Sequence, residues 1–203
     1  MPTARKPFHL ILAVVVAITA LQPALAEPRP ARRDTAQAQS PSALSFNGVG
    51  YAHRWSKGNQ HEFTPAGQEE LSRWQDMITL IARPDVDDGE ALAGLAESLL
   101  AQYKAAGKIV KTGSTPRTED RPAEHLLIAL LPGNGFFETV FVRFKLIDGT
   151  GVMAIYAHRN YGKTAAQDFG AWIEANGTKV ERALMEWSAI PTPASLEKLP
   201  QRR

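Results

Sequence analysis

The chain has 203 residues, of which 23 are Lys or Arg, 21 are Asp or Glu and none is Cys. The lack of cysteine excludes disulfides, cysteine-ligated zinc sites, cysteine nucleophiles and lipoprotein anchors. The first 26 residues include Arg5 and Lys6 and no acid, so the rest of the chain holds 21 basic and 21 acidic residues. This zero net charge argues against a nucleic-acid-binding protein, and we expect no nucleic acid among the partners.

Residues 1–26 have the three parts of a secretory signal peptide. Two basic residues stand near the start, residues 10–20 (LILAVVVAITA) are apolar, and residues 24–26 (ALA) match the small-x-small cleavage pattern. We expect cleavage after Ala26 and a periplasmic location; an uncleaved membrane anchor is the alternative. No later run reaches about 18 apolar residues, so we expect no transmembrane segment after cleavage.

The remaining chain divides into a linker, one domain and a tail. Residues 27–44 are rich in Pro and Ala and have no apolar periodicity, which predicts a disordered linker. Residues 45–189 are long enough for one folded domain. Residues 190–203 (IPTPASLEKLPQRR) contain three prolines and a basic end, and we expect a flexible C-terminal tail.

The first half of the domain predicts a hairpin, a short helix, a strand, a long helix and a further strand. The hairpin is centred on residues 56–59, and Thr64-Pro65 has the sequence of a helix N-terminus. Asp87 and Glu90 form a capping-box pattern ahead of Leu and Tyr residues at helical spacing. We expect these elements at residues 50–63, 65–74, 76–82, 87–107 and 108–112.

The second half predicts a three-stranded meander and a terminal helix. The strands are expected at residues 124–131, 136–147 and 152–159, and the loops between them are PGNG and DGTG. A helix follows from Thr164, with an interruption at Asn176-Gly177 before it continues to Trp187.

The meander has one clearly apolar face if both loops close directly, with Leu131 opposite Phe136 and Ile147 opposite Val152. A slip of one residue would bury Arg143 and Lys145, so this assignment of faces is favoured. The apolar face consists of Leu127, Ala129, Val140, Val142, Phe144, Leu146, Met153 and Ile155. The second face carries a row of Glu124, Arg143 and Tyr156 beside a row of Leu126, Phe141 and His158. That face is either covered by a terminal segment or left open as a binding surface.

Together these elements predict a single α+β domain. We expect an antiparallel sheet of about five to seven strands, including the 124–159 meander, with helices packed mainly on one face. The element order resembles the PsbP-like α/β/α sandwich. The stretch HEFTPAGQE at residues 61–69, with WQDM at residues 74–77, resembles uncharacterised exported proteins of Gram-negative bacteria. The resemblance to exported proteins implies a small, non-enzymatic binding or accessory domain, and the PsbP-like resemblance assigns no catalytic residue.

The sequence shows no motif for metal binding or catalysis after residue 26. His53, His61, His125 and His158 lack metal-ligand spacing, and His53 and His61 are expected on opposite faces of the hairpin. No G-x-S-x-G elbow is present. We therefore expect no metal, no cofactor and no catalytic residue. A small envelope-directed hydrolase, with His53, His61 or His158 as general base, is the alternative.

Aromatic and basic residues gather on the first hairpin and can bind a partner by stacking and hydrogen bonding. The candidate binding residues are Tyr51, His53, Arg54 and Trp55 on the hairpin and Arg143, Tyr156 and His158 on the open sheet face. The polar loop at residues 111–121 is a second candidate contact surface. We expect a non-catalytic periplasmic accessory or binding protein whose partner is an envelope protein or a glycan. A structural or inhibitory partner of an envelope protein is a further alternative.

Overall fold

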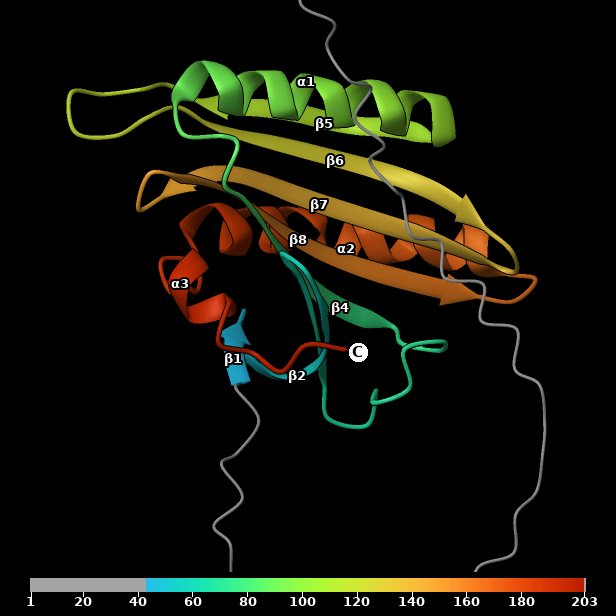
Figure 1. Ribbon diagram of the computed structural model, residues 1–203. Coiled ribbons are helices and arrows are strands. Elements are labelled where there is room, and N and C mark those ends of the chain that lie inside the picture. The colour runs from blue at the N-terminus through green and yellow to red at the C-terminus, as the bar shows by residue number, and fades with distance from the viewer. Residues whose placement is uncertain (1–42, 203) are drawn as a thin grey trace, which may run out of the picture. The chain divides into compact units, whose positions relative to one another are not determined.

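The structure, a computed structural model, describes residues 43–202 (Figure 1). The predicted signal peptide and the linker up to residue 42 lie outside the described residues. The strands are β1 (Ala43–Phe46), β2 (Val49–Lys57), β3 (Gln60–Pro65), β4 (Asp76–Arg83), β5 (Lys108–Thr115), β6 (Glu124–Gly133), β7 (Phe136–Ile147) and β8 (Thr150–Tyr161). The helices are α1 (Gly89–Ala106), α2 (Ala165–Glu186) and α3 (Pro193–Leu196).

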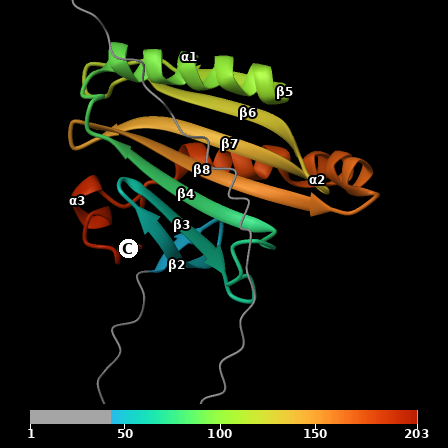
Figure 2. The same cartoon turned by 45° about the vertical axis from the view of Figure 1, so that its right-hand side comes forward.

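The described strands form one antiparallel sheet in the order β1-β2-β3-β4-β8-β7-β6-β5. Two meanders, β1 to β4 and β5 to β8, join where β4 pairs with β8 at the centre of the sheet (Figure 2). Helix α1 carries the chain from β4 to the far edge at β5. The predicted α+β class with an antiparallel sheet is confirmed, although the described part has eight strands rather than five to seven.

Helix α1 covers one face of the sheet and forms the α1-face core with it. The buried side chains of α1 pack against the apolar residues of the meander. They are Leu92, Leu95, Leu99 and Tyr103, and they contribute to one cluster with Leu127, Ala129, Val140, Val142, Phe144 and Met153. The Asp88 side chain caps the helix by accepting a hydrogen bond from Ala91 N at 2.8 Å. The predicted apolar face is therefore confirmed as core.

Helix α2 covers the opposite face, so the helices do not lie mainly on one side as predicted (Figure 1). This α2-face core combines residues of β6, β7 and β8 with the buried side of α2. Its members include Leu126, Ile128, Phe141, Ala154 and Tyr156 from the strands and Val180, Leu184 and Trp187 from the end of the chain. The second sheet face is thus closed by a terminal segment rather than open as a surface.

The meander register differs from the predicted one by two residues in each hairpin. Gly133 lies opposite Phe136, and Ile147 lies opposite Thr150. The turns are the two-residue sequences Asn134-Gly135 and Asp148-Gly149 rather than four-residue loops. The Asp-Gly dipeptide closes its hairpin in the conformation that matches strand twist. Asp148 and Gly149 accordingly both have positive φ, 50° and 73°. An even shift keeps every side chain on its predicted face.

The predicted helix at residues 65–74 is wrong, since residues 66–75 form turns and irregular structure. Pro65 ends β3, and Gly67 has a φ of 81° that interrupts any helix. The Thr64 hydroxyl donates to the Gln68 carbonyl at 2.5 Å, and the Gln68 side chain accepts from Gln75 N and Asp76 N at 2.7 Å each. These side-chain hydrogen bonds shape the loop.

Three further boundaries differ from the prediction. Helix α2 continues through Asn176-Gly177, because the Asn176 side chain donates to the Trp172 carbonyl at 3.0 Å and Gly177 is buried against Ile173. Residues 43 and 44, assigned to the linker, belong to β1. Residues 190–202, predicted as a flexible tail, include α3. They place Ile190, Leu196 and Leu199 in the α2-face core.

Candidate functional site

His158 and Tyr156 converge on the carboxylate of Asp76, where β4 pairs with β8. Nδ1 of His158 lies 2.9 Å from Asp76 Oδ1, and the Tyr156 hydroxyl donates to the same oxygen at 2.7 Å. Trp172 of α2 stacks on the His158 ring, with centroids 4.1 Å apart and planes 8° apart. The predicted binding residues Tyr156 and His158 are therefore buried beneath α2.

The protonation of this cluster follows from its hydrogen bonds. Burial alone raises the pKa of Asp76, but hydrogen bonds from His158, Tyr156 and Gln68 outweigh it and leave that pKa lowered. Burial and the Asp76 carboxylate raise the pKa of the Tyr156 hydroxyl, which therefore stays protonated as a donor. The cluster ties β4, β8 and α2 together.

Arg143 is buried, 4% exposed, and holds the end of α2 to the sheet. Its Nε donates to Glu124 Oε2 at 2.7 Å, and its Nη1 donates to the carbonyls of Leu184 and Trp187 at 2.9 and 3.0 Å. The last carbonyls of a helix lack partners within the helix and carry partial negative charge, so a cation there is stabilising. Glu124 and Arg143, which the sequence placed in one row, form an ion pair, but Arg143 is no part of an open surface.

His53, Ser56 and His61 form a hydrogen-bonded cluster on the first hairpin. Ser56 Oγ lies 2.6 Å from His53 Nε2 and 2.7 Å from His61 Nδ1. A β-bulge between His53 and Trp55 inserts a residue into β2 and turns His53 to the side of His61. The expectation that the two histidines lie on opposite faces is wrong for this reason.

The His53–Ser56–His61 cluster is closed to solvent at its centre. Ser56 is 0% exposed and His61 is 1% exposed. Burial lowers the pKa of both histidines, and the charge that His53 would carry lowers the pKa of His61 further. A serine beside an imidazole can transfer its proton in acyl-transfer chemistry. No substrate reaches a hydroxyl buried in this way unless its cover moves.

The other hairpin residues make internal contacts. Arg54 donates to Thr64 Oγ1 at 2.9 Å and pairs with Glu69 at 3.1 Å, which fixes it over the loop after β3. Tyr51 is buried in the α2-face core. Of the seven predicted binding residues, His53, Arg54 and Trp55 keep partial exposure, and the other four are buried.

A half-buried charge cluster on the α1 face was not predicted from the sequence. The Arg159 guanidinium lies between the rings of Trp74 and Phe136, 3.9 and 4.2 Å from their centroids, and bonds to Glu138 at 2.7 Å. Burial raises the pKa of Glu138 and of neighbouring Glu62, and Arg159 partly opposes this. Glu138 lies directly opposite Arg159, whereas the predicted register, offset by two residues, did not pair them. With the correct turn length, the sequence would have paired Glu138 with Arg159.

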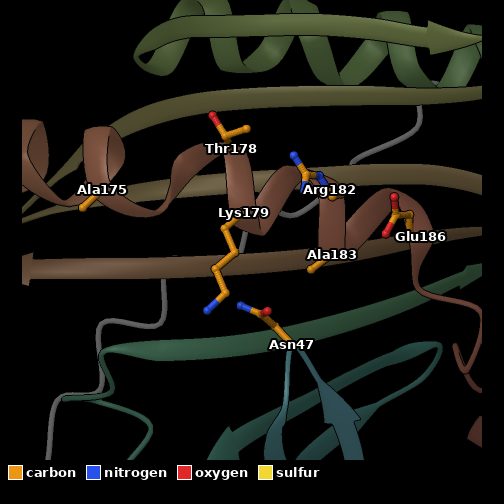
Figure 3. A pocket seen from close by; sticks show the side chains of 7 residues that line it. All are labelled: Asn47, Ala175, Thr178, Lys179, Arg182, Ala183 and Glu186. Carbon is orange, nitrogen blue, oxygen red and sulfur yellow. The ribbon is translucent and has the colours of Figure 1, made fainter.

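The outward side of α2 is flanked by two hollows that open to solvent. One, about 410 Å³, lies between α2 and the turn after β1 and includes Asn47, Lys179 and Ala183; the other, about 310 Å³, lies toward β5 and includes Lys111 and Met185. Thr178, Arg182 and Glu186 line both hollows. Figure 3 shows Lys179 reaching from α2 toward Asn47. None of the seven predicted binding residues lines either hollow.

The described residues, 43–202, contain no group of three or more His, Asp or Glu side chains placed to hold a metal ion. None of their helices combines the length and the apolar character needed to cross a membrane.

Comparison with known proteins finds similarity of structure only. No family model and no curated protein matches the chain. The Ran-binding protein Mog1p of Saccharomyces cerevisiae aligns with a TM-score of 0.43 and 14% identity over 67% of this chain and 82% of that one. A Pseudomonas aeruginosa protein of unknown function aligns with a TM-score of 0.43 and 12% identity over 74% and 98% of the two chains. At such identities the likeness carries no information about activity or site residues.

Proposed function

We propose that the chain is an exported accessory protein of the bacterial envelope that binds a partner protein, without catalysis, through the outward side of α2. The observation that carries this proposal is the pair of hollows that share Thr178, Arg182 and Glu186. A ridge between two hollows offers a partner a shape that side chains can interlock with, as the centre of a specific interface requires.

The charges on this surface indicate what kind of partner it suits. Lys111 is neutralised by Glu181, with its Nζ 2.7 Å from Oε1. Lys179 and Arg182 have no ion-pair partner among the described residues. A partner that presents carboxylates to Lys179 and Arg182 gains attraction and orientation from them. The signal-like pattern of residues 1–26 supports the exported location.

The binding proposal predicts a charge-dependent capture. The chain from residue 27 onward, used as bait in an envelope extract, is expected to retain one protein in stoichiometric amount. The double variant Lys179→Glu/Arg182→Glu should bind that protein at least about tenfold more weakly, a loss of about 1.4 kcal/mol, because attraction becomes repulsion. The dissociation constants are measured with the purified pair.

The matched control places the same charge change elsewhere. Arg117→Glu/Arg121→Glu alters two exposed residues in the loop between β5 and β6, the second contact surface considered from the sequence. It should bind like the unaltered protein. If the α2 double variant binds as tightly as the unaltered protein, the partner does not bind through the outward side of α2. If only the loop variant loses affinity, the partner binds the loop instead.

Export predicts a defined mature terminus. In a bacterial host, the protein recovered from the periplasmic fraction is expected to begin at Glu27 when its N-terminus is sequenced. An Ala24→Arg/Ala26→Arg variant should remain uncleaved, because the cleavage site requires small residues at these positions. Recovery of the unaltered protein in the cytoplasmic fraction with Met1 intact argues against export.

A further inference from the structure

The end of the chain lies over the side of the sheet that contains the His53–Ser56–His61 cluster. Arg202 N donates to the Ser56 carbonyl at 2.9 Å, and Leu196 and Leu199 pack in one cluster with Phe63 of β3. Figures 1 and 2 both place α3 and the C-terminal residues beside β2. The carbonyl that holds the end of the chain thus belongs to the same residue whose hydroxyl joins the two histidines.

Residues 190–202 are held to the sheet mainly by apolar contacts. Helix α3 is only four residues long, and its hydrogen bonds run within the segment, from Ser195 and Leu196 to Thr192. Within the described part of the chain, the bond from Arg202 to Ser56 is the one backbone hydrogen bond that ties this segment to a strand. A change in the position of Ser56 therefore acts directly on the end of the segment.

The His53–Ser56–His61 cluster can accommodate one proton but not two. The serine hydroxyl carries one hydrogen, which it donates to one imidazole nitrogen while it accepts from the other. This arrangement works when both rings are neutral or when one is protonated. When both rings are protonated, both facing nitrogens become donors, and the hydroxyl hydrogen loses its acceptor. Two positive charges are then separated by a single hydroxyl, at a site that is buried at Ser56 and His61 and half-buried at His53.

Neighbouring charged side chains do not offset a second proton. On β2, Arg54 is paired with Glu69 and Lys57 is exposed. On β3, Glu62 adjoins His61 in sequence and points to the opposite face. On β4, Asp76 bonds to Tyr156 and His158, and Arg83 pairs with Asp85. The C-terminal segment contributes the exposed side chains of Glu197, Lys198 and Arg202.

We propose that residues 190–202 form a proton-sensitive strap, which opens when the His53–Ser56–His61 cluster takes up a second proton. Opening breaks the bond from Arg202 to Ser56 and uncovers the apolar side chains of β1, β2 and β3 beneath the segment. The lowered pKa of both histidines supports this direction: the closed form is favoured above the ordinary histidine pKa of 6.5 and loses stability as the pH falls through the lowered values.

Hydrogen exchange by mass spectrometry on the full chain tests the strap between pH 7.5 and pH 5. After correction for intrinsic exchange, the hydrogen-bonded amides of residues 196–199 and of Arg202 should be protected at pH 7.5. In the acid range their protection should fall by about tenfold per pH unit for each proton linked to opening. The amides of α1 should keep their protection, because the strap opens without unfolding the domain.

Two variants separate the strap from general acid sensitivity. His53→Gln retains hydrogen-bonding groups but does not titrate, and His53 is only half-buried, so the variant is expected to fold and to keep its strap protected down to pH 5. The control His125→Gln alters a histidine that bonds to Ser114 on the far side of the sheet and should retain the pH dependence. The proposal is overturned if α1 loses protection in parallel with the strap, or if the strap is unprotected at pH 7.5 or insensitive to pH. It is also overturned if the strap of His53→Gln loses protection with pH as steeply as that of the unaltered protein.

Discussion

Replacing Arg143 with alanine is expected to destabilise the protein by about 3–5 kcal/mol, the cost of breaking a buried ion pair from one side. The guanidinium neutralises Glu124 and satisfies the carbonyls of Leu184 and Trp187 at the end of α2. Its removal leaves a half-neutralised carboxylate and a Trp187 carbonyl without its donor, while the Leu184 carbonyl keeps only its 3.3 Å bond from Trp187 N. The loss is measured by urea unfolding of the variant and the unaltered protein under identical conditions.

Lys145→Ala is the matched control, because Lys145 pairs with the other oxygen of Glu124 at 2.9 Å but is 31% exposed. Solvent screens that pair, so the control should cost less than about 1 kcal/mol. An Arg143→Ala cost as small as that of the control would mean that Arg143 lies at a solvated surface, as the sequence alone suggested. It would also mean that α2 does not cover this face.

The strand faces could be predicted from the sequence because they depend only on alternation. Phe144 and Val142 fall on one face, and Arg143 on the other, whichever two-residue register the hairpins adopt. The pairing itself depends on turn length. Four turn-forming residues do not reveal whether all four or only the central two form the loop, so the predicted register did not pair Glu138 with Arg159.

The covering of the second face could not be predicted from the strands alone. Glu124, Arg143, Tyr156 and His158 suggest a wet surface when they are taken one strand at a time. In the folded chain each finds a partner in another element, such as Asp76 on β4 or the end of α2. Polar groups with such partners can be buried at little net cost. The helix that covers this face, α2, was predicted, but its packing on the second face of the sheet was not.

The candidate site was missed for a similar reason of local geometry. Regular alternation places His53 and His61 on opposite faces, and one extra residue at the bulge after His53 reverses this. No residue in the sequence HRWS marks a bulge. Likewise, the three prolines after residue 189 suggested a loose tail, whereas the spacing of Ile190, Leu196 and Leu199 was the signal that the tail packs.

Phe144→Ala and Phe141→Ala are each expected to destabilise the protein by about 3–5 kcal/mol, as truncations of fully buried aromatic side chains. Phe144 packs in the α1-face core and Phe141 in the α2-face core, three residues apart on β7. If one face of the sheet were solvated, only Phe144→Ala would destabilise the protein by this much. Comparable losses from both therefore report that β7 is buried on both sides.

The measurement is the change in urea unfolding free energy, with Val110→Ala as control because Val110 is 45% exposed at the β5 edge. That control should stay within about 0.5 kcal/mol. A near-neutral Phe144→Ala contradicts the α1-face core and with it the register of the meander. A near-neutral Phe141→Ala, with Phe144→Ala costly, means that α2 does not pack on the sheet. In that case the contacts of Arg143 with α2 and the proposed binding surface on α2 are both wrong, since both require the helix to pack on the sheet.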